Sequence, residues 1–185
     1  AVDSLTGVAN RRAVIAALDR DVARSIRTHE PMALMMVDID HFKNVNDRYG
    51  HPAGDKVLCS VVEVLRERVR SQDLVGRYGG EEFMVLLPDT TARGGYLLAQ
   101  QLCEAVQAVH LEHEGQPIPV TVSIGVYGGR LQPGDHRDML ISAADRALYE
   151  AKDRGRNRVE VVEALRRPAS LVTANSGSET QPALF

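Results

Sequence analysis

Two adjacent glycines followed by two carboxylates form the stretch of this sequence with the clearest chemical potential. The segment Arg77-Tyr78-Gly79-Gly80-Glu81-Glu82-Phe83 lies between two apolar runs that are typical of β-strands. Glycine accepts the positive φ of tight turns, so the pair predicts a hairpin. It also lets a bulky anion approach the backbone, and carboxylates beside that opening favour a divalent cation as intermediary. The segment predicts a metal–phosphate site, with an ordinary solvated hairpin as the alternative.

A third carboxylate follows a run of apolar residues. Four consecutive apolar residues, Leu34-Met35-Met36-Val37, suit a buried strand, and Asp38 falls where that strand ends. Carboxylates at a strand end beside a hairpin can supply oxygen ligands for Mg²⁺. Residues His51 to Leu58 are typical of a loop that leads into a helix. The alternative for Asp38 and Asp40 is an ordinary acidic loop.

Hydrophobic periodicity and turn residues predict the elements that position these side chains. Helices are predicted at Asn10 to about His29, Phe42 to Arg48, Asp55 to Val69, Thr91 to about His110, and Arg137 to Lys152. Strands are predicted at Met32 to Val37, on both sides of Gly79-Gly80, at Val120 to Val126, and at Val159 to Val162. Asp135 is a candidate N-cap for the last helix, and Glu114 to Pro117 is predicted to be a turn.

Helices and strands alternate along the chain, but the central hairpin excludes a purely parallel sheet. We therefore expect a mixed α/β sandwich in which residues 1–165 form one domain. From Pro168 onward the sequence is rich in Ser, Thr, Asn and Gly without periodicity. Residues 166–185 are therefore predicted to be a flexible C-terminal tail.

The composition limits the classes of protein to consider. The 185 residues, 44% of them hydrophobic, suffice for one domain with a substantial core. A net charge of −3 gives no basic field for binding a nucleic-acid polymer. No apolar run approaches the roughly 18 residues of a membrane span and no signal peptide opens the chain, so we expect a cytoplasmic domain without membrane contact. Cys59 and Cys103 are predicted to be reduced core thiols rather than a disulfide or metal pair.

The chain resembles the GGDEF family of diguanylate cyclases, with the Gly-Gly-Glu-Glu-Phe variant of the hairpin motif. The resemblance covers nearly everything from Asp3 to Val162 and rests on five motifs in order at compatible spacing. They are Asp3-Ser4-Leu5-Thr6-Gly7-Val8-Ala9-Asn10-Arg11-Arg12, the block from Asp38 to Asp55, Arg77 to Phe83, Thr121-Val122-Ser123-Ile124-Gly125-Val126, and Ala144 to Asn157. The resemblance implies a mainly antiparallel sheet flanked by helices, like the palm of polymerases and nucleotide cyclases. Because relatives usually carry a sensor or receiver domain upstream, it also implies an output domain.

The reaction implied by the resemblance joins two GTP molecules into cyclic di-GMP and releases two pyrophosphates. Two Mg²⁺ ions per half-site, with Mn²⁺ as a possible substitute, would shield the triphosphate and lower the pKa of the attacking ribose hydroxyl. Asp38, the backbone carbonyl of Ile39, and Glu81 are the implied metal ligands. Glu82 would add charge beside the second metal, and Glu81 would also accept the proton. We expect Asp40 to have a structural role.

The resemblance also implies the residues that contact phosphate. Lys152 and Arg156 would bind the β- and γ-phosphates, and Lys43 would lie near the transition state. Lys152 and Arg156 are one helical turn apart, so they can point along one helix face. Their alternative is a solvated basic face. The other implied substrate contacts of this group are Phe42, Gly79 and Gly80.

Guanine recognition is assigned by the resemblance to Asn46 and Asp55. A carboxylate can accept hydrogen bonds from guanine N1–H and from the exocyclic amine together, whereas adenine offers no such pair of donors. A buried acceptor left unpaired costs about 1–3 kcal/mol, which is enough to disfavour ATP. The alternative for Asp55 is an N-cap of the following helix. His51 would lie by the substrate, with a turn-stabilising role as its alternative.

Arg70-Ser71-Gln72-Asp73 matches the R-x-x-D motif through which the product inhibits members of the family. Arginine can donate paired hydrogen bonds to phosphate, and aspartate can accept from the guanine edge. The alternative is a surface ion pair. Relatives with strong inhibition often carry a further arginine on the next helix, but Leu97 to Gln107 contains none. We therefore expect weaker cross-linking of two domains by cyclic di-GMP.

The leading interpretation is an active diguanylate cyclase that works as a homodimer of half-sites. The main alternative is a non-catalytic receptor for GTP or cyclic di-GMP, against which the intact set of Asp38, Lys43, Asp55, Glu81 and Glu82 argues. An interaction module that only dimerises would not need these residues. A class III mononucleotide cyclase would share the fold and the metal chemistry but not this Gly-Gly hairpin at this position.

Overall fold

The computed structural model describes residues 1–164 of the chain. The predicted C-terminal tail, residues 166–185, lies outside the described residues. None of the helices in the described part combines the length and the apolar character that crossing a bilayer requires.

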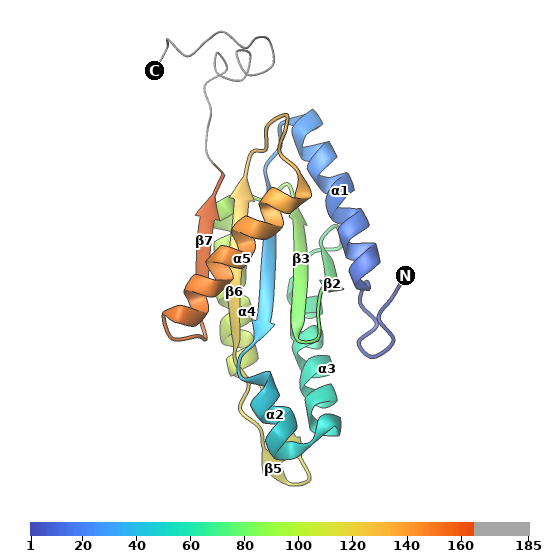
Figure 1. Ribbon diagram of the computed structural model, residues 1–185, viewed down its shortest axis with the longest axis vertical. Coiled ribbons are helices and arrows are strands. Elements are labelled where there is room, and N and C mark those ends of the chain that lie inside the picture. The colour runs from blue at the N-terminus through green and yellow to red at the C-terminus, as the bar shows by residue number, and fades with distance from the viewer. Residues whose placement is uncertain (165–185) are drawn as a thin grey trace.

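A five-stranded sheet forms the centre of the domain (Figure 1). Its strands lie in the order β2 (Leu74–Arg77), β3 (Glu82–Pro88), β1 (Met32–Ile39), β6 (Val122–Gly129) and β7 (Val159–Glu163). All neighbouring strands are antiparallel except β6 and β7, which are parallel. The predicted mainly antiparallel sheet flanked by helices is therefore confirmed.

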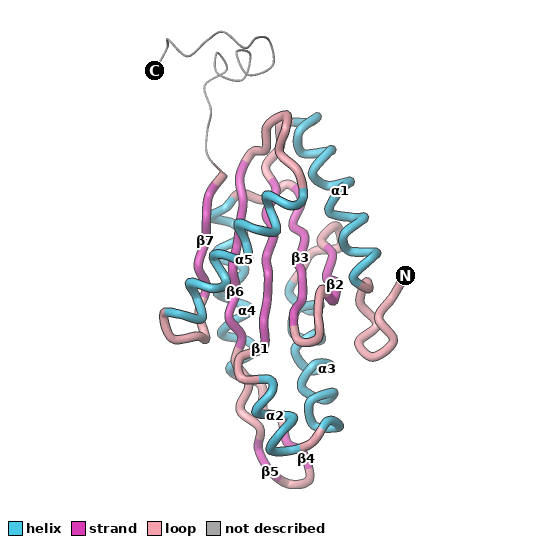
Figure 2. The backbone as a smooth tube through the Cα atoms, viewed as in Figure 1, coloured by secondary structure: helices cyan, strands magenta, loops and turns pink. Residues whose placement is uncertain are grey.

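Helices cover both faces of the sheet (Figures 1 and 2). One face carries α1 (Arg11–Thr28) and α5 (Arg137–Asp153), and the other carries α3 (His51–Arg68) and α4 (Ala92–Gln107). The short helix α2 (Phe42–Tyr49) follows the end of β1. Every residue of β1 is buried, because alternate side chains of this strand belong to the two different cores.

One predicted helix start and one predicted N-cap differ from the structure. Helix α3 begins at His51 rather than at Asp55, because Pro52 occupies the first turn, where a missing N–H costs no helical hydrogen bond. The predicted N-cap Asp135 is also wrong, since the N-cap of α5 is His136. The Oδ2 atom of Asp135 instead accepts a hydrogen bond of 2.9 Å from the backbone N–H of Gln132.

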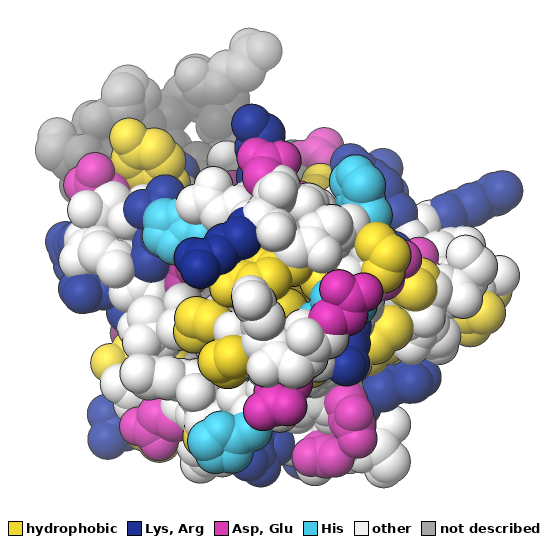
Figure 3. All heavy atoms as spheres, turned by 90° about the horizontal axis from the view of Figure 1, so that it is seen from below, with side chains coloured by type: hydrophobic (Ala, Val, Ile, Leu, Met, Phe, Trp, Pro, Cys, Tyr) yellow, Lys and Arg dark blue, Asp and Glu magenta, His cyan; other side chains and the backbone are white. Residues whose placement is uncertain are grey.

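The segment predicted as a turn at Glu114 to Pro117 forms part of a small hairpin. Strands β4 (Glu112–His113) and β5 (Gln116–Pro117) pair at the end of the molecule that carries α2 (Figure 2). Lys56 of α3 donates from Nζ to the carbonyl of Glu112 at 2.5 Å and so ties this hairpin to the domain. Seen from this end, the surface mixes charged and histidine side chains with hydrophobic ones (Figure 3).

Both cysteines are free, as predicted, and they lie on different helices. Cys103 is buried, and this burial raises the pKa of its thiol to about 12. Cys59 is half-buried, with its sulfur 3.6 Å from the carbonyl oxygen of Leu5. Cys103 is not in a position typical of a reactive cysteine, because burial and nearby carboxylates disfavour its thiolate.

Candidate active site

The β2–β3 hairpin presents residues 78–81 at its tip. The backbone N–H groups of Tyr78 and Gly79 both donate to the carbonyl of Glu82, at 2.9 and 3.1 Å. The strands behind them are in register, with Arg77 opposite Phe83. The fold therefore holds the glycine pair at the exposed end of a paired ribbon, as the sequence predicted.

The predicted positive φ of the two glycines is wrong, whereas the predicted room for an anion beside them gains support. Neither Gly79 nor Gly80 adopts a φ in the left-handed region, so the turn itself does not require glycine. A Cβ atom built on Gly80 would have no neighbour within 4 Å, and one on Gly79 would meet only Glu82 at 3.6 Å. Packing within the described chain does not require glycine here either. The open space suits a bulky group from outside the chain, such as a nucleotide phosphate.

Arg77 fixes the tip of the hairpin from behind. Its guanidinium donates to the carbonyl of Gly80 at 2.8 Å and to that of Gly79 at 3.3 Å. It also forms an ion pair of 3.2 Å with Asp3, which accepts further hydrogen bonds from Thr6. Burial opposes ionisation of Asp3, but the Thr6 hydrogen bonds and the charge of Arg77 outweigh it and lower the pKa of this carboxyl. The first and third motifs of the sequence are thus one structural unit.

Asp38 and Glu82 lie opposite each other on β1 and β3. Asp38 is only 5% exposed, and its Oδ2 atom pairs with the ammonium of Lys152. Its other oxygen, Oδ1, is buried and has no hydrogen-bond partner among the described residues. Burial raises the pKa of Asp38, and burial together with the negative charge of Asp38 raises the pKa of Glu82. This is an electrostatic arrangement that a bound cation would relieve.

The residues around Asp38 fit a divalent cation. The backbone N–H of Ile39 donates to the carbonyl of Glu81 at 3.2 Å, so these two candidate ligands are neighbours. In residues 1–164, no three side chains of His, Cys, Asp or Glu gather into a metal-binding cluster. Mg²⁺ is usually held by one or two carboxylates together with substrate phosphates and water. The unpartnered Oδ1 atom of Asp38 is what such a site needs.

Asp40 has the structural role that the sequence analysis gave it. Its two oxygens accept hydrogen bonds of 2.7 Å from the hydroxyls of Thr121 and Ser123. One of them also accepts from the backbone N–H of Asn157 at 3.0 Å. With these bonds Asp40 joins β1, β6 and the loop after α5, and its oxygens are already in use.

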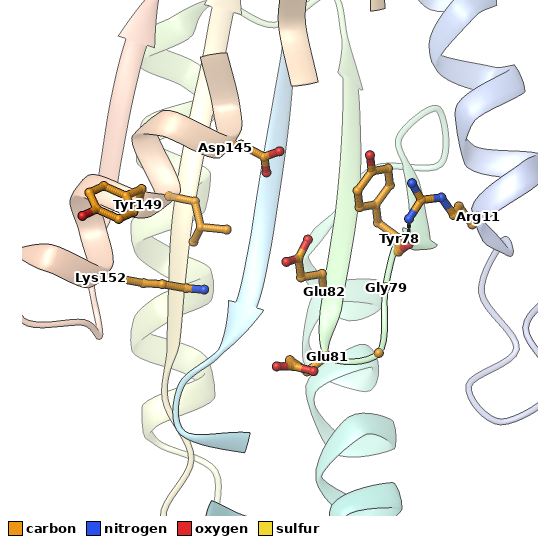
Figure 4. A pocket seen from close by; sticks show the side chains of 10 residues that line it. Arg11, Tyr78, Gly79, Glu81, Glu82, Asp145, Tyr149 and Lys152 are labelled. Carbon is orange, nitrogen blue, oxygen red and sulfur yellow. Dashed lines mark hydrogen bonds between the residues drawn. The ribbon is translucent and has the colours of Figure 1, made fainter. Parts of the chain in front are cut away.

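A cavity of about 530 Å³ opens beside the hairpin tip (Figure 4). It is lined by Arg11, Tyr78, Gly79, Gly80, Glu81, Glu82, Asp145, Leu148, Tyr149 and Lys152. The last four of these form one face of α5, at spacings of three and four residues. The sequence analysis assigned a role only to Lys152 among them. This i, i+3, i+4, i+7 pattern around Lys152 is the signal that could have revealed the others.

Arg11 reaches the same cavity from the start of α1. Its guanidinium lies over the ring of Tyr78, 4.1 Å from the ring centroid, and donates to the Tyr78 carbonyl at 2.9 Å. The face of an aromatic ring attracts a cation electrostatically, and this attraction holds the Arg11 guanidinium over Tyr78. Arg11 was quoted in a motif of the sequence but given no function.

The start of α2 lies beyond the end of β1. Its N-cap, His41, is left-handed with a φ of 56° and makes no side-chain capping bond. N–H groups at such a helix start are available to an anion. Phe42 and Lys43 occupy this first turn, and the Lys43 side chain is 89% exposed, with a loose 3.9 Å contact to Asp47. Lys43 does not line the cavity beside the hairpin.

The predicted guanine contacts lie where α2 meets α3. A Cβ atom on Gly54 would come within 1.9 Å of Asn46 Oδ1 and 3.2 Å of Phe42, so glycine is required for this close approach. Asp55 follows Gly54 in α3, and its side chain is exposed. The alternative N-cap role of Asp55 is wrong because the helix begins at His51, which is also exposed. The sequence analysis quoted Gly54 without recognising its role.

Lys152 and Arg156 do not share a helix face. Helix α5 ends at Asp153, and Arg156 follows in a left-handed conformation with a φ of 65°. Its backbone N–H donates to the carbonyl of Ala151 at 3.0 Å, which closes the end of the helix. The prediction of a shared face is wrong, and a phosphate-binding role of Arg156 stays a prediction.

The Arg70–Asp73 motif is a closed turn. Asp73 has a side chain with no exposed surface, and both of its oxygens accept hydrogen bonds from Arg70. Arg70 also donates to the carbonyl of Pro88 and to the hydroxyl of Thr90, each at 2.8 Å. In this arrangement Asp73 cannot accept from a guanine edge, whereas Arg70 keeps part of its guanidinium exposed. The inhibitory role of the pair stays a prediction.

The fold is that of a mixed α/β domain whose central hairpin presents two glycines and two carboxylates beside a cavity. The family model for "Diguanylate cyclase, GGDEF domain" matches residues 1–158. The chain therefore belongs to the GGDEF family.

Curated relatives agree with this assignment. The diguanylate cyclase DgcP of Pseudomonas aeruginosa is 42% identical over 159 residues, which cover 86% of this chain and 23% of DgcP. The response regulator PleD of Caulobacter vibrioides is 39% identical over 159 residues, which cover 85% of this chain and 35% of PleD. The chain thus spans only a quarter to a third of the length of these relatives.

Solved structures show the same fold. The GGDEF domain of DgcB from Caulobacter crescentus, in complex with c-di-GMP, has a TM-score of 0.82 at 34% identity and covers 86% of this chain and 92% of that one. The active GGEEF domain of a diguanylate cyclase from Vibrio cholerae has a TM-score of 0.76 at 31% identity and covers 87% and 99%.

Proposed function

We propose that this domain is a diguanylate cyclase that condenses two GTP molecules into cyclic di-GMP and two pyrophosphates. The observation that carries the proposal is the open tip at Gly79 and Gly80 beside the unpartnered, buried Oδ1 atom of Asp38. An empty space and a desolvated carboxylate side by side suit a phosphate with its counter-cation. Relatives named as diguanylate cyclases support the same reaction.

Each half of the reaction forms one phosphodiester bond. The 3′-hydroxyl of one GTP attacks the α-phosphorus of the other, an O3′–P bond forms, and the bond from that phosphorus to the pyrophosphate oxygen breaks. Glu81 takes the hydroxyl proton, and pyrophosphate leaves with the electron pair of the broken bond. The domain contributes mainly by holding nucleophile and phosphate in line and by stabilising charge.

Asp38, the carbonyl of Ile39, and Glu81 would hold Mg²⁺ or Mn²⁺, with Glu82 beside a second ion. When bound, the metal supplies charge neutralisation of the triphosphate and a lower pKa for the attacking hydroxyl. Lys152 pairs with Asp38, so it lies close enough to contact a phosphate whose counter-cation is held at Asp38.

The remaining contacts orient the substrate. Lys43 and the free N–H groups at the start of α2 bind phosphate, and Arg156 adds a second cation. Asn46 and Asp55 read guanine, an assignment that the close approach of Asn46 to Gly54, the residue before Asp55, supports. His51 lies one turn before Asp55 at the same helix end.

A single chain offers one half-site, because Asp38, Asn46, Asp55 and the glycine pair each occur once in its motifs. A product with two phosphodiester links therefore needs two copies facing each other, a homodimer formed during catalysis. Cyclic di-GMP would inhibit through Arg70, which Asp73 holds in place. An upstream sensor or receiver domain in the longer protein would set how often two copies meet. We infer a cytoplasmic location, because GTP is supplied there.

Incubation with GTP and Mg²⁺, followed by separation of nucleotides by mass, tests the proposal. We expect cyclic di-GMP and pyrophosphate, no product after chelation of the metal, and no product from ATP alone. Binding of GTP without turnover would instead identify a receptor and refute the proposal. A 3′,5′-cyclic mononucleotide as product would identify a class III cyclase.

Mixed dimers give a sharper test of the two half-sites. Equal amounts of the parent chain and Glu81→Gln pair at random, so about half of the dimers have one competent centre. Such dimers should accumulate the linear dinucleotide pppGpG, because only one of the two bonds can form. Parent dimers should release cyclic product with little linear intermediate. Absence of linear product in the mixture would contradict the two-centre mechanism.

A further inference from the structure

A second recess adjoins the catalytic cavity along α5. It measures about 480 Å³ and is lined by Tyr78, Asp138, Ile141, Ser142, Asp145, Arg146 and Tyr149. Three of these residues, Tyr78, Asp145 and Tyr149, also line the catalytic cavity, so the two recesses form one continuous surface. We call this second depression the α5 recess. Neither the metal ligands nor the predicted guanine contacts line it.

The middle of this surface carries an aromatic side chain with little to contact. Tyr149 is 70% exposed, the largest exposed fraction among the exposed hydrophobic side chains of the described residues. It projects from α5 at the edge of the cavity, across from Tyr78 (Figure 4). Exposed aromatic residues that border a functional cavity are typical of surfaces that another molecule covers.

The proposed reaction defines what could cover it. Two copies must face each other about a two-fold axis that passes close to the hairpin tip, so that each hydroxyl reaches the other phosphate. In Figure 1 the hairpin tip lies between α5 on one side and α2 on the other. A two-fold axis that passes through the tip and runs across the strand direction exchanges these two sides, and so it brings the α5 of one copy opposite the α2 of its partner.

The charges of the two surfaces are complementary. The α5 recess carries two carboxylates, Asp138 and Asp145, and one arginine, Arg146. Within residues 1–164, no ion pair is formed by Asp145, and Asp138 has only a 3.8 Å contact to its neighbour Arg137. Helix α2 exposes Lys43, Asp47 and Arg48, and the charges of Lys43 and Asp47 offset each other at 3.9 Å. The Arg48 guanidinium lies only over the ring of its neighbour Tyr49, at 5.3 Å. Its charge is therefore available to an outside carboxylate.

We propose that the α5 recess is the docking surface for the α2 helix of a second copy of this chain, with Arg48 facing Asp138 and Asp145. The inference rests on the proposed function, which supplies the two-fold geometry. Each dimer contains this contact twice, once on either side of the paired substrates. Docking closes the catalytic cavity and brings Tyr149 of each copy against its partner.

Sedimentation with Mg²⁺ and a GTP analogue carrying a non-cleavable α–β bridge measures the dissociation constant of this dimer without turnover. Ser142 is exposed and lines the α5 recess but not the catalytic cavity. Ser142→Arg adds bulk and positive charge there and should raise the dissociation constant at least about tenfold, because like charges then meet across the interface. The affinity of the monomer for the analogue, measured by calorimetry, should not change. Gln107→Arg, on exposed α4 surface of the opposite face, is the matched control and should leave the constant within about twofold.

A charge exchange identifies the partner surface. Arg48→Glu alone should also weaken the dimer, because the new carboxylate then faces the two carboxylates of the recess, Asp138 and Asp145. Together with Ser142→Arg in one chain it should return the constant to within about threefold of the parent, since opposite charges meet again. Additive weakening in the double variant would show that α2 is not the occupant.

The outcomes separate this inference from the proposed function. A parent chain that makes no cyclic di-GMP from GTP and Mg²⁺ refutes the function. A parent that makes cyclic di-GMP, together with a Ser142→Arg chain that dimerises and turns over like the parent, leaves the function standing and refutes the docking surface.

Discussion

The hairpin tip and the Arg70–Asp73 turn are both short polar motifs, yet their polar groups are satisfied to opposite degrees. At the tip, Asp38 Oδ1 has no partner among the described residues and the space above Gly80 is open. In the turn, the buried Asp73 carboxylate is fully bonded to Arg70, which also holds Pro88 and Thr90. Unsatisfied buried groups are rare in folded chains, and a water, an ion or a ligand can complete them. The two motifs match the family equally well, but of the two only the hairpin tip leaves a buried polar atom of the described residues free to bind a ligand.

A substitution at the open hairpin tip should lower activity without lowering stability. Glu81 makes no side-chain hydrogen bond or ion pair that would be lost in the described chain, so Glu81→Gln should leave the melting temperature unchanged. Turnover should fall about 10²–10⁴-fold, because a metal ligand and proton acceptor is lost. Steady-state assays with calorimetry of GTP binding check both points. Near-normal synthesis by this variant would remove Glu81 from the mechanism.

Asp55 on α3 is exposed as well, and its replacement should change which base is accepted. Asp55→Ser shortens the side chain, so it cannot accept both guanine donors. Discrimination against ATP should weaken by about 1–3 kcal/mol, or up to about a hundredfold in relative kcat/KM. Assays with mixed ATP and GTP measure it. If the variant discriminated as sharply as the parent, Asp55 would have no part in base recognition.

A substitution in the closed Arg70–Asp73 turn should lower stability and leave the initial rate nearly unchanged. Asp73→Ala leaves the Arg70 guanidinium and backbone N–H without their acceptor, so the free energy of unfolding should fall by about 1–3 kcal/mol. The initial rate at low product concentration should stay close to that of the parent. Urea denaturation and initial-rate assays test the pair of statements. A large loss of initial rate at full stability would place Asp73 in the catalytic region.

Arg70→Ala tests whether the closed turn also binds product. Part of the Arg70 side chain remains exposed, so it can contact phosphate while its other donors hold the turn. Activity at high product concentration should rise by a few-fold, and the initial rate should change little. Calorimetric titration with cyclic di-GMP is the direct measurement. An unaltered affinity would mean that the motif is only structural.

Much of the fold could be predicted from hydrophobic periodicity. The pattern predicts each of the helices α1 to α5 and the two strands around Gly79-Gly80, because each of these elements buries one apolar face. Helix starts were less predictable, since they depend on which backbone groups find partners nearby. Pro52 allowed α3 to begin before Asp55, and Asp135 bonded to Gln132 instead of capping α5. The parallel placement of β7 beside β6 is a tertiary property that local patterns do not encode.

The candidate site was predictable where one short motif contains the whole feature. The hairpin and the position of Asp38 near the end of β1 follow from types and spacing within a few residues, whereas the partners of Asp40 lie 81 to 117 positions away along the sequence. The shared face of Lys152 and Arg156 failed because α5 ends between them. Asp145, Tyr149 and Arg11 were missed because their relevance arises only when α5 and α1 pack beside the hairpin.

The empty space at Gly80 has an evolutionary consequence. Gly76 and Gly125 are held by folding itself, since a Cβ on either would come within 2.4 Å of Val14 or 2.2 Å of the Ala144 carbonyl. Gly80 meets no such obstacle, so replacing it would leave the folded chain intact. In a lineage released from selection for synthesis, this glycine is free to drift while its neighbours in the sheet remain. Degenerate copies of such a domain should therefore survive as stable folds that have lost the glycine of the tip first.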